Sequence, residues 1–175
     1  MTLAQAKQIV RFLLDAEVYF QYEKKLSTYF DLGQKRIACT TDFLSADKVI
    51  VQSEAGQVDL TEMDERFYRL KKIEGGEWEK LSPTRVNLKA GEYHIYYEIY
   101  PTDITDQTPE EYEFEISEFA QTALPYFVAA QITIAEHDLR YHQIYSDEFA
   151  AILENAAQAR ASGNLHVVQF EGWNK

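Results

Sequence analysis

The feature that most constrains this chain is the stretch from Phe119 to Ala135, which contains no charged residue. A helix that is apolar on all sides is a buried one. The stretch is shorter than the ~20 residues that cross a bilayer. It also contains Gln121, Gln131 and Pro125, and acidic residues flank it instead of Lys or Arg. We therefore expect the central helix of a folded core and no membrane span.

A second helix is expected directly after this run, with Asp138 as its N-cap. Its apolar positions step by three and four residues, and Gly163-Asn164 is predicted to end it. Pro125 removes one backbone hydrogen bond within the first helix, so a kink or a restart is expected there. The predicted core residues of the two helices are Leu124, Pro125, Phe127, Ala130, Ile134, Tyr145, Phe149 and Ile152.

Two more helices are predicted near the N-terminus. Thr2 is placed to cap the first, and the second is expected to run from Asp15 to about Thr41. Gly33 would lie in the middle of the second helix, where glycine costs about 1 kcal/mol relative to alanine. We expect the close approach of another helix to offset that cost. Lys7 and Arg11 interrupt the first apolar run, so no signal peptide is expected.

Between these helical pieces the hydrophobic period changes to that of short strands separated by glycine and proline turns. In the last strand Tyr93, Ile95, Tyr97 and Ile99 share the face expected in the core. The chain is thus predicted to be α+β, with a four-helix core of two N-terminal and two C-terminal helices and an inserted antiparallel sheet or sandwich. The strands are expected at Lys48–Gln52, Gln57–Leu60, Arg66–Ile73, Trp78–Leu81, Arg85–Leu88 and Glu92–Tyr100, with Tyr112–Ile116 as a further short one.

The predicted domain boundaries follow from this order of elements. Residues 1–44 and 117–161 form the helical core, and residues 45–116 form the β-insertion. Residues 162–175 form a hydrophobic C-terminal tail, which we expect to dock on its own domain or on a neighbour. The predicted interface residues are Tyr96 and Tyr100 on the sheet, and Leu165, Val167, Val168, Phe170 and Trp173 in the tail.

Composition restricts the classes of partner. The net charge of −12 would repel the phosphates of nucleic acids, so a direct grip on DNA is not expected. The single cysteine, Cys39, excludes an internal disulfide and a cysteine-built metal site, and we expect it to be a small buried hydrophobe.

No motif for catalysis or metal binding stands out. His137 and His142 are five residues apart, whereas a zinc helix needs a step of four. The acidic loop around Asp103 and Glu110 lacks the spacing and the glycine of a calcium loop. The sequence carries no serine elbow, phosphate loop or dinucleotide fingerprint. We expect no catalytic residue, no metal and no cofactor, although a cleft of carboxylates with perturbed pKa values, as in a hydrolase, stays open.

Three segments give the chain a family resemblance. The first is the opening helix followed by a long helix ending GQKRIA, Gly33–Ala38, and the second is the strand from Gly91 through Tyr97 to Pro101. The third and strongest is ALPYFVAAQ, Ala123–Gln131, with Asp138 and Tyr145 downstream. In these segments the chain resembles the helical head–tail connector proteins of tailed bacteriophages, also called adaptor, neck or head-completion proteins.

The resemblance implies a non-catalytic structural protein of the virion. Such a subunit would form a ring under the portal protein, dodecameric to match it, and would extend the DNA channel without binding DNA specifically. It would also dock tail-terminator or stopper proteins. Its place would be the neck of the virion, and the host cytoplasm during assembly.

A carbohydrate- or peptide-binding module is the alternative that the residues leave open. Tyr96 and Tyr100 lie on the outward face of one strand, two pleats apart, and could form an aromatic platform.

Overall fold

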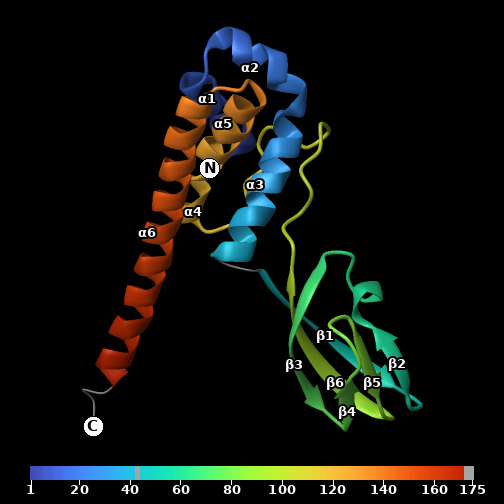
Figure 1. Cartoon of the computed structure of the whole chain (residues 1–175). Helices are drawn as coiled ribbons and strands as arrows, with labels where there is room; N and C mark the ends of the chain where they lie inside the picture. Colours follow the sequence, from blue (N-terminus) through green and yellow to red (C-terminus); the bar gives the residue numbers. More distant parts are fainter. Residues whose placement is uncertain (42–43, 172–175) are drawn as a thin grey trace. The chain divides into compact units, whose positions relative to one another are not determined.

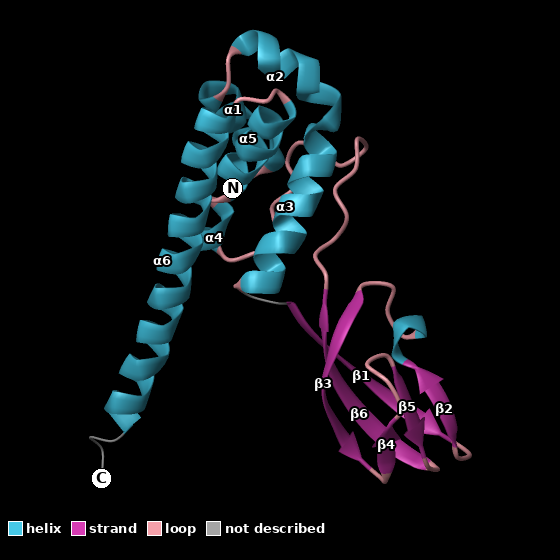
Figure 2. Ribbon diagram, in the orientation of Figure 1, coloured by secondary structure: helices cyan, strands magenta, loops and turns pink. Residues whose placement is uncertain are grey.

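The computed structural model describes residues 1–41 and 44–171, and the side chains of residues 1–41 and 44–158. The chain divides into two compact units, Met1–Asp42 with Asp103–Lys175, and Phe43–Thr102. The first unit holds the α-helices, and the second holds all the strands that form sheets (Figure 1, Figure 2). The predicted α+β class is therefore confirmed.

The helical unit begins with α1, Leu3–Leu13, which Thr2 caps as predicted. The Thr2 hydroxyl accepts from the Gln5 amide, and the Gln5 side chain accepts from the Thr2 amide in return. The predicted second helix is divided into α2, Ala16–Tyr22, a 3₁₀ turn η1, Glu23–Lys25, and α3, Leu26–Thr40. Buried positions keep the spacing of three and four residues across η1, so the periodicity of the sequence could not show the break.

The C-terminal part of the unit has three helices instead of two. They are α4, Glu118–Gln121, α5, Leu124–Ala135, and α6, Leu139–Glu171. Pro125 lies in the first turn of α5, where a missing amide hydrogen costs nothing, so the chain restarts a helix there and does not kink.

The helix α6 is longer than predicted. Its backbone stays helical through Gly163-Asn164 to Glu171, so the predicted end at that dipeptide is wrong. One glycine costs a helix only about 1 kcal/mol, and no proline follows to stop its propagation. Figure 1 shows the C-terminal part of α6 extending beyond the other helices of its unit.

The core of the helical unit surrounds α5, which contacts α1, α3 and α6. Leu124, Pro125, Ala130 and Tyr145 are buried as predicted, and Phe127, Phe149 and Ile152 are half-buried against the same cluster. Ile134 is 44% exposed, so its predicted place in the core is wrong. One side of the last turn of α5 is uncovered, even though its sequence is as apolar as that of the buried turns.

The segment 103–116 belongs to the helical unit. Its predicted place in the β-insertion is therefore wrong. The predicted strand at Tyr112–Ile116 is reduced to one isolated bridge between Thr2 and Glu113. Two buried glutamines hold this segment. Gln34 accepts hydrogen bonds from the Glu115 amide and the Tyr112 hydroxyl, and Gln121 donates to two main-chain carbonyls of the segment.

The second unit contains six strands close to the predicted ones. One sheet has the order β1-β6-β3 and the other has the order β2-β5-β4, and every pairing is antiparallel. A 3₁₀ turn, η2, Leu60–Glu62, follows β2. The strands are β1, Leu44–Gln52, β2, Gly56–Asp59, β3, Phe67–Gly75, β4, Trp78–Lys80, β5, Arg85–Leu88, and β6, Gly91–Ile99.

The two sheets share one hydrophobic core. Tyr93, Ile95, Tyr97 and Ile99 of β6 are all buried, which confirms the predicted inward face. They belong to the same cluster as Leu60, Val86 and Leu88, of which the last two lie on β5 of the other sheet. The unit is therefore a small sandwich.

Two further expectations concern single features. Cys39 lies on the exposed side of α3, so its predicted burial is wrong. No helix in the described part of the chain is long and apolar enough to cross a membrane.

Candidate functional site

A groove of about 490 Å³ runs along the helical unit between α3, α5 and α6. The rings of Phe127 and Phe149, with centroids 5.4 Å apart, belong to its lining. Leu32, 51% exposed, lines it from α3. Arg36 and Gln131 add a polar edge. An apolar floor with a polar rim is the composition of a protein-binding surface.

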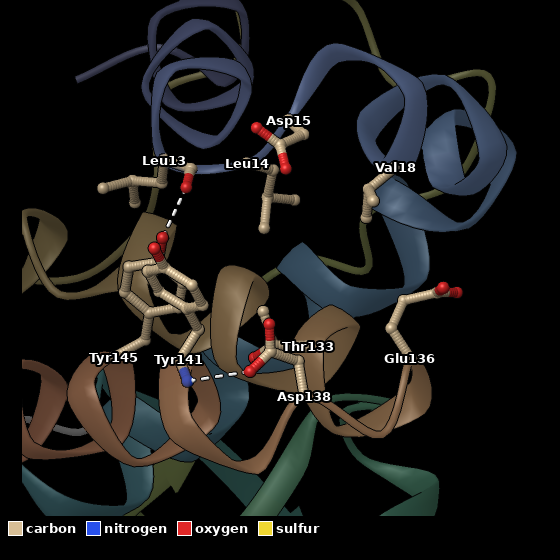
Figure 3. Close-up of a pocket in the computed structure, with 9 residues that line it drawn as sticks. All are labelled: Leu13, Leu14, Asp15, Val18, Thr133, Glu136, Asp138, Tyr141 and Tyr145. Carbon is tan, nitrogen blue, oxygen red and sulfur yellow. Dashed lines mark hydrogen bonds between the residues drawn. The ribbon is translucent and has the colours of Figure 1, made fainter.

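A second hollow, of about 150 Å³, lies where the α1–α2 junction meets the α5–α6 turn (Figure 3). The Tyr145 hydroxyl donates to the main-chain carbonyl of Leu13, and the Asp138 carboxylate accepts from the Tyr141 amide at 3.2 Å. The second bond confirms the predicted N-cap of α6. The other lining residues are Leu14, Asp15, Val18, Thr133 and Glu136.

Several polar groups in and beside this hollow form hydrogen bonds. The Tyr22 hydroxyl, from α2, donates to the Glu136 carboxylate at 2.6 Å, and this bond raises the pKa of Tyr22 to about 12. Burial raises the pKa of Tyr145 above the ordinary tyrosine value. The Thr133 hydroxyl donates to the Ala129 carbonyl within its own helix. Among the described residues of the hollow, no nucleophile lies hydrogen-bonded to a base, which is the arrangement that nucleophilic catalysis needs. Its hydrogen bonds instead connect one helix to another.

The histidines near the α5–α6 turn have structural positions. His137 adopts a φ of 60°, which turns the chain from α5 into α6. A ring nitrogen of His142 lies 2.9 Å from the Ala130 carbonyl, to which it donates. Among the described residues no group of three histidines, cysteines or carboxylates is placed to hold a metal ion.

The outward face of the sheet β1-β6-β3 is more polar than its sequence indicates. The Tyr96 ring stacks on His94, with centroids 4.3 Å apart, and Tyr100 meets Tyr68 edge to face at 4.8 Å. Between the two tyrosines in sequence lies Glu98, buried by its ion pair with Arg69 at 2.8 Å. A charged pair thus lies between the two tyrosines that could have formed an aromatic platform.

His94 pairs with a carboxylate on the neighbouring strand. Its Nε2 lies 2.6 Å from the Asp47 carboxylate on β1. Asp47 comes within reach because β1 pairs with β6 in a register that places it opposite Tyr96, diagonal to His94. Only strand pairing, which the sequence leaves open, could have revealed this contact.

The remaining interface predictions concern the C-terminal segment. Leu165, Val167, Val168 and Phe170 lie in the helical backbone of α6, and their side chains are outside the described residues, as is all of Trp173. Their predicted role stays a prediction.

No protein-family model matches the sequence, and a search of curated proteins finds no match. The features that bear on function are therefore the groove, the hollow and the sheet face described above, together with the resemblance in the Ala123–Gln131 segment.

Proposed function

We propose that this protein is a head-to-tail connector of a tailed bacteriophage, a structural protein that forms a ring beneath the portal. In this role it extends the DNA channel and docks tail-terminator or stopper proteins. The resemblance in Ala123–Gln131 supports the proposal, and that segment contributes most of α5, the helix around which the core is built.

The observation that carries the proposal is the number of large apolar side chains left uncovered on the helical unit. Phe12 on α1, Phe119 on α4 and Leu139 on α6 are between 68% and 80% exposed. A ring requires apolar surface on both flanks of each subunit, because every subunit contacts two neighbours through different patches. The other exposed apolar residues of this unit are Ile9, Phe20, Leu32, Ile134, Tyr141 and Ile144.

The groove between α3, α5 and α6 and the projecting end of α6 fit the same role. The groove provides an accepting surface of suitable composition, and the end of α6 reaches beyond its own core. The net charge of −12 would allow DNA to pass through a channel without being held.

Binding to purified portal rings is the direct test. The wild-type protein should co-sediment with portal rings and be present in mature virions. The size of the isolated protein is a poor substitute, because such a subunit can stay monomeric until it meets the portal. Absence from virions would contradict the proposal.

A matched pair of variants makes the test specific to the surface. Leu139→Ser with Ile144→Ser removes apolar contacts from exposed positions of α6 and should weaken portal binding at an unchanged melting temperature. Val49→Ser, at an exposed position of the β unit, is the control and should bind as the wild type does.

A binding module for carbohydrate or peptide is the second candidate, favoured by a hollow of about 330 Å³ on the sheet β1-β6-β3. Tyr96 lines it together with Lys71, Lys72 and Glu74. Screening for glycan or peptide binding, followed by Tyr96→Ala and Tyr100→Ala, tests this function. Binding that both substitutions abolish would favour it over the connector.

A further inference from the structure

Four strands lie at sheet edges, and β1 is the one among them that no structural feature protects from pairing with a further strand. β2 and β4 have only four and three residues, and short edges offer little for pairing. The register of β3 is interrupted twice, and it carries Arg69, Lys71 and Lys72. β1 has nine residues and keeps an unbroken register with β6 from Leu44 to Gln52. Register shifts, which normally hinder pairing with a further strand, therefore interrupt β3 but not β1.

The surroundings of β1 leave it accessible. None of its residues is buried, and Val49 and Val51, which share the outward face, are 53% and 75% exposed. Its charged side chains are engaged within their own unit. Asp47 pairs with His94, and the Lys48 ammonium donates to the main-chain carbonyl of Met63 at 2.9 Å. Lys48 is thus held toward its own fold and is not free to guard the edge.

We propose that β1 is a self-association site, at which the β1 strands of two copies pair antiparallel about a two-fold axis at Ile50. This register places Val49 opposite Val51 of the second copy, and Lys48 opposite Gln52. Only Lys48–Gln52 of each strand then pair, because Ser53 already belongs to the turn after β1, and no two like charges are opposed in this stretch. In this pair the exposed Val49 and Val51 of one copy cover Val51 and Val49 of the other, and we therefore take the partner to be a second copy.

The pairing joins two three-stranded sheets into one of six strands, in the order β3-β6-β1-β1-β6-β3. Its contact is small, well below the roughly 1,000 Å² of a stable interface, so the dimer is a transient one that forms at high concentration. The pairing is isologous and closes on itself, so it is independent of the portal contact in the proposed function.

Cross-linking between two single-cysteine variants tests the register. Val49→Cys and Val51→Cys are each made with Cys39→Ser, because the native Cys39 is exposed and would cross-link as well. After mild oxidation the mixture of the two should give a disulfide-linked heterodimer, and each variant alone should stay monomeric. Both positions are exposed, so the melting temperatures should equal that of Cys39→Ser.

Two outcomes would overturn the proposal. No heterodimer at the highest attainable concentration would show that β1 does not pair with itself. Equal cross-linking of Val49→Cys alone would show a parallel or unspecific contact, because the antiparallel register keeps the two copies of position 49 apart.

Charge variants give a second, solution-based readout. The double variant Val49→Lys and Val51→Lys places two pairs of opposed lysines in the dimer, one on each side of the axis, and should weaken the dimer at least tenfold in sedimentation equilibrium. The corresponding double glutamate variant should behave alike, and mixing the two should restore association. Restored association without portal rings would support the pairing even if the connector function failed.

Discussion

A Cβ atom added at Gly33 would lie 2.8 Å from Cδ1 of Phe127, and 3.0 Å from a methyl carbon of Leu124. The helices α3 and α5 thus approach closely at Gly33, as its position in mid-helix predicted, and a larger residue there would require a side chain of α5 to shift. Gly33→Ala should lower the free energy of unfolding by up to about 2 kcal/mol, because overpacking costs about 1–3 kcal/mol while alanine restores about 1 kcal/mol of helix propensity. Urea denaturation gives the value.

The control for this prediction is the same substitution in a Phe127→Ala background. With the ring removed, the alanine at position 33 should stabilise the protein by up to about 1 kcal/mol. An effect of the same sign and size in both backgrounds would show that the contact with Phe127 is not the reason for the glycine.

Leu124→Asp should unfold the protein. The Leu124 side chain is fully buried in the helical core, and an unpaired charge there costs several kcal/mol, comparable with the whole stability of a domain. Ile134→Asp is the matched control on the same helix, at a position that is 44% exposed, and should change stability by less than about 1 kcal/mol. Circular dichroism and thermal melting distinguish the two, and equal melting of both variants would contradict the assignment of the core.

The hydrogen bond from Tyr22 to Glu136 should make stability depend on alkaline pH. The pKa of Tyr22 rises from 10.0 to about 12 on folding, so its contribution is complete below pH 10 and is lost as the pH rises to about 12. Tyr22→Phe should reduce this loss of stability relative to the wild type, as measured by urea denaturation at a series of pH values. Identical profiles for the two proteins would show that the bond does not form in solution.

Deleting Leu165–Lys175 should leave a folded subunit that assembles poorly. Among the described side chains of α6, those that belong to the core or pack against it include Tyr145, Phe149, Ile152 and Leu153, and these precede the deletion. The melting temperature should therefore change little, while binding to portal rings decreases if the end of α6 contacts a neighbour. Undiminished head–tail joining by the truncated protein would contradict a docking role for this segment.

The sequence predicted the elements better than their ends. Alternation in β6 was sufficient to assign its buried face, because a strand has only two sides. The predicted end of α6 was wrong because Gly163 is a weak signal for the end of a helix when no proline follows it. The exposure of Ile134 and Cys39 depends on which neighbouring helices cover each turn, and local spacing does not contain that information.

The candidate surfaces were less predictable than the fold. Tyr96 does lie on the outward face of β6, whereas Tyr100 follows the end of that strand, and the Arg69 that pairs with Glu98 comes from the neighbouring strand β3. The exposed edge of β1 and the groove between α3, α5 and α6 depend on pairing and packing across long sequence separations. Such features have no signature in a single sequence.

The helical unit is discontinuous in the chain, and this determines the order in which the protein can be completed on the ribosome. The sandwich can close as soon as its last strand, β6, has been made. α1 and α3 must wait for α5, which is synthesised several seconds later than α3 at roughly 5–20 residues per second. During that interval the nascent chain carries a finished sandwich and two uncovered N-terminal helices, and these helices are the part of it that a chaperone would need to protect.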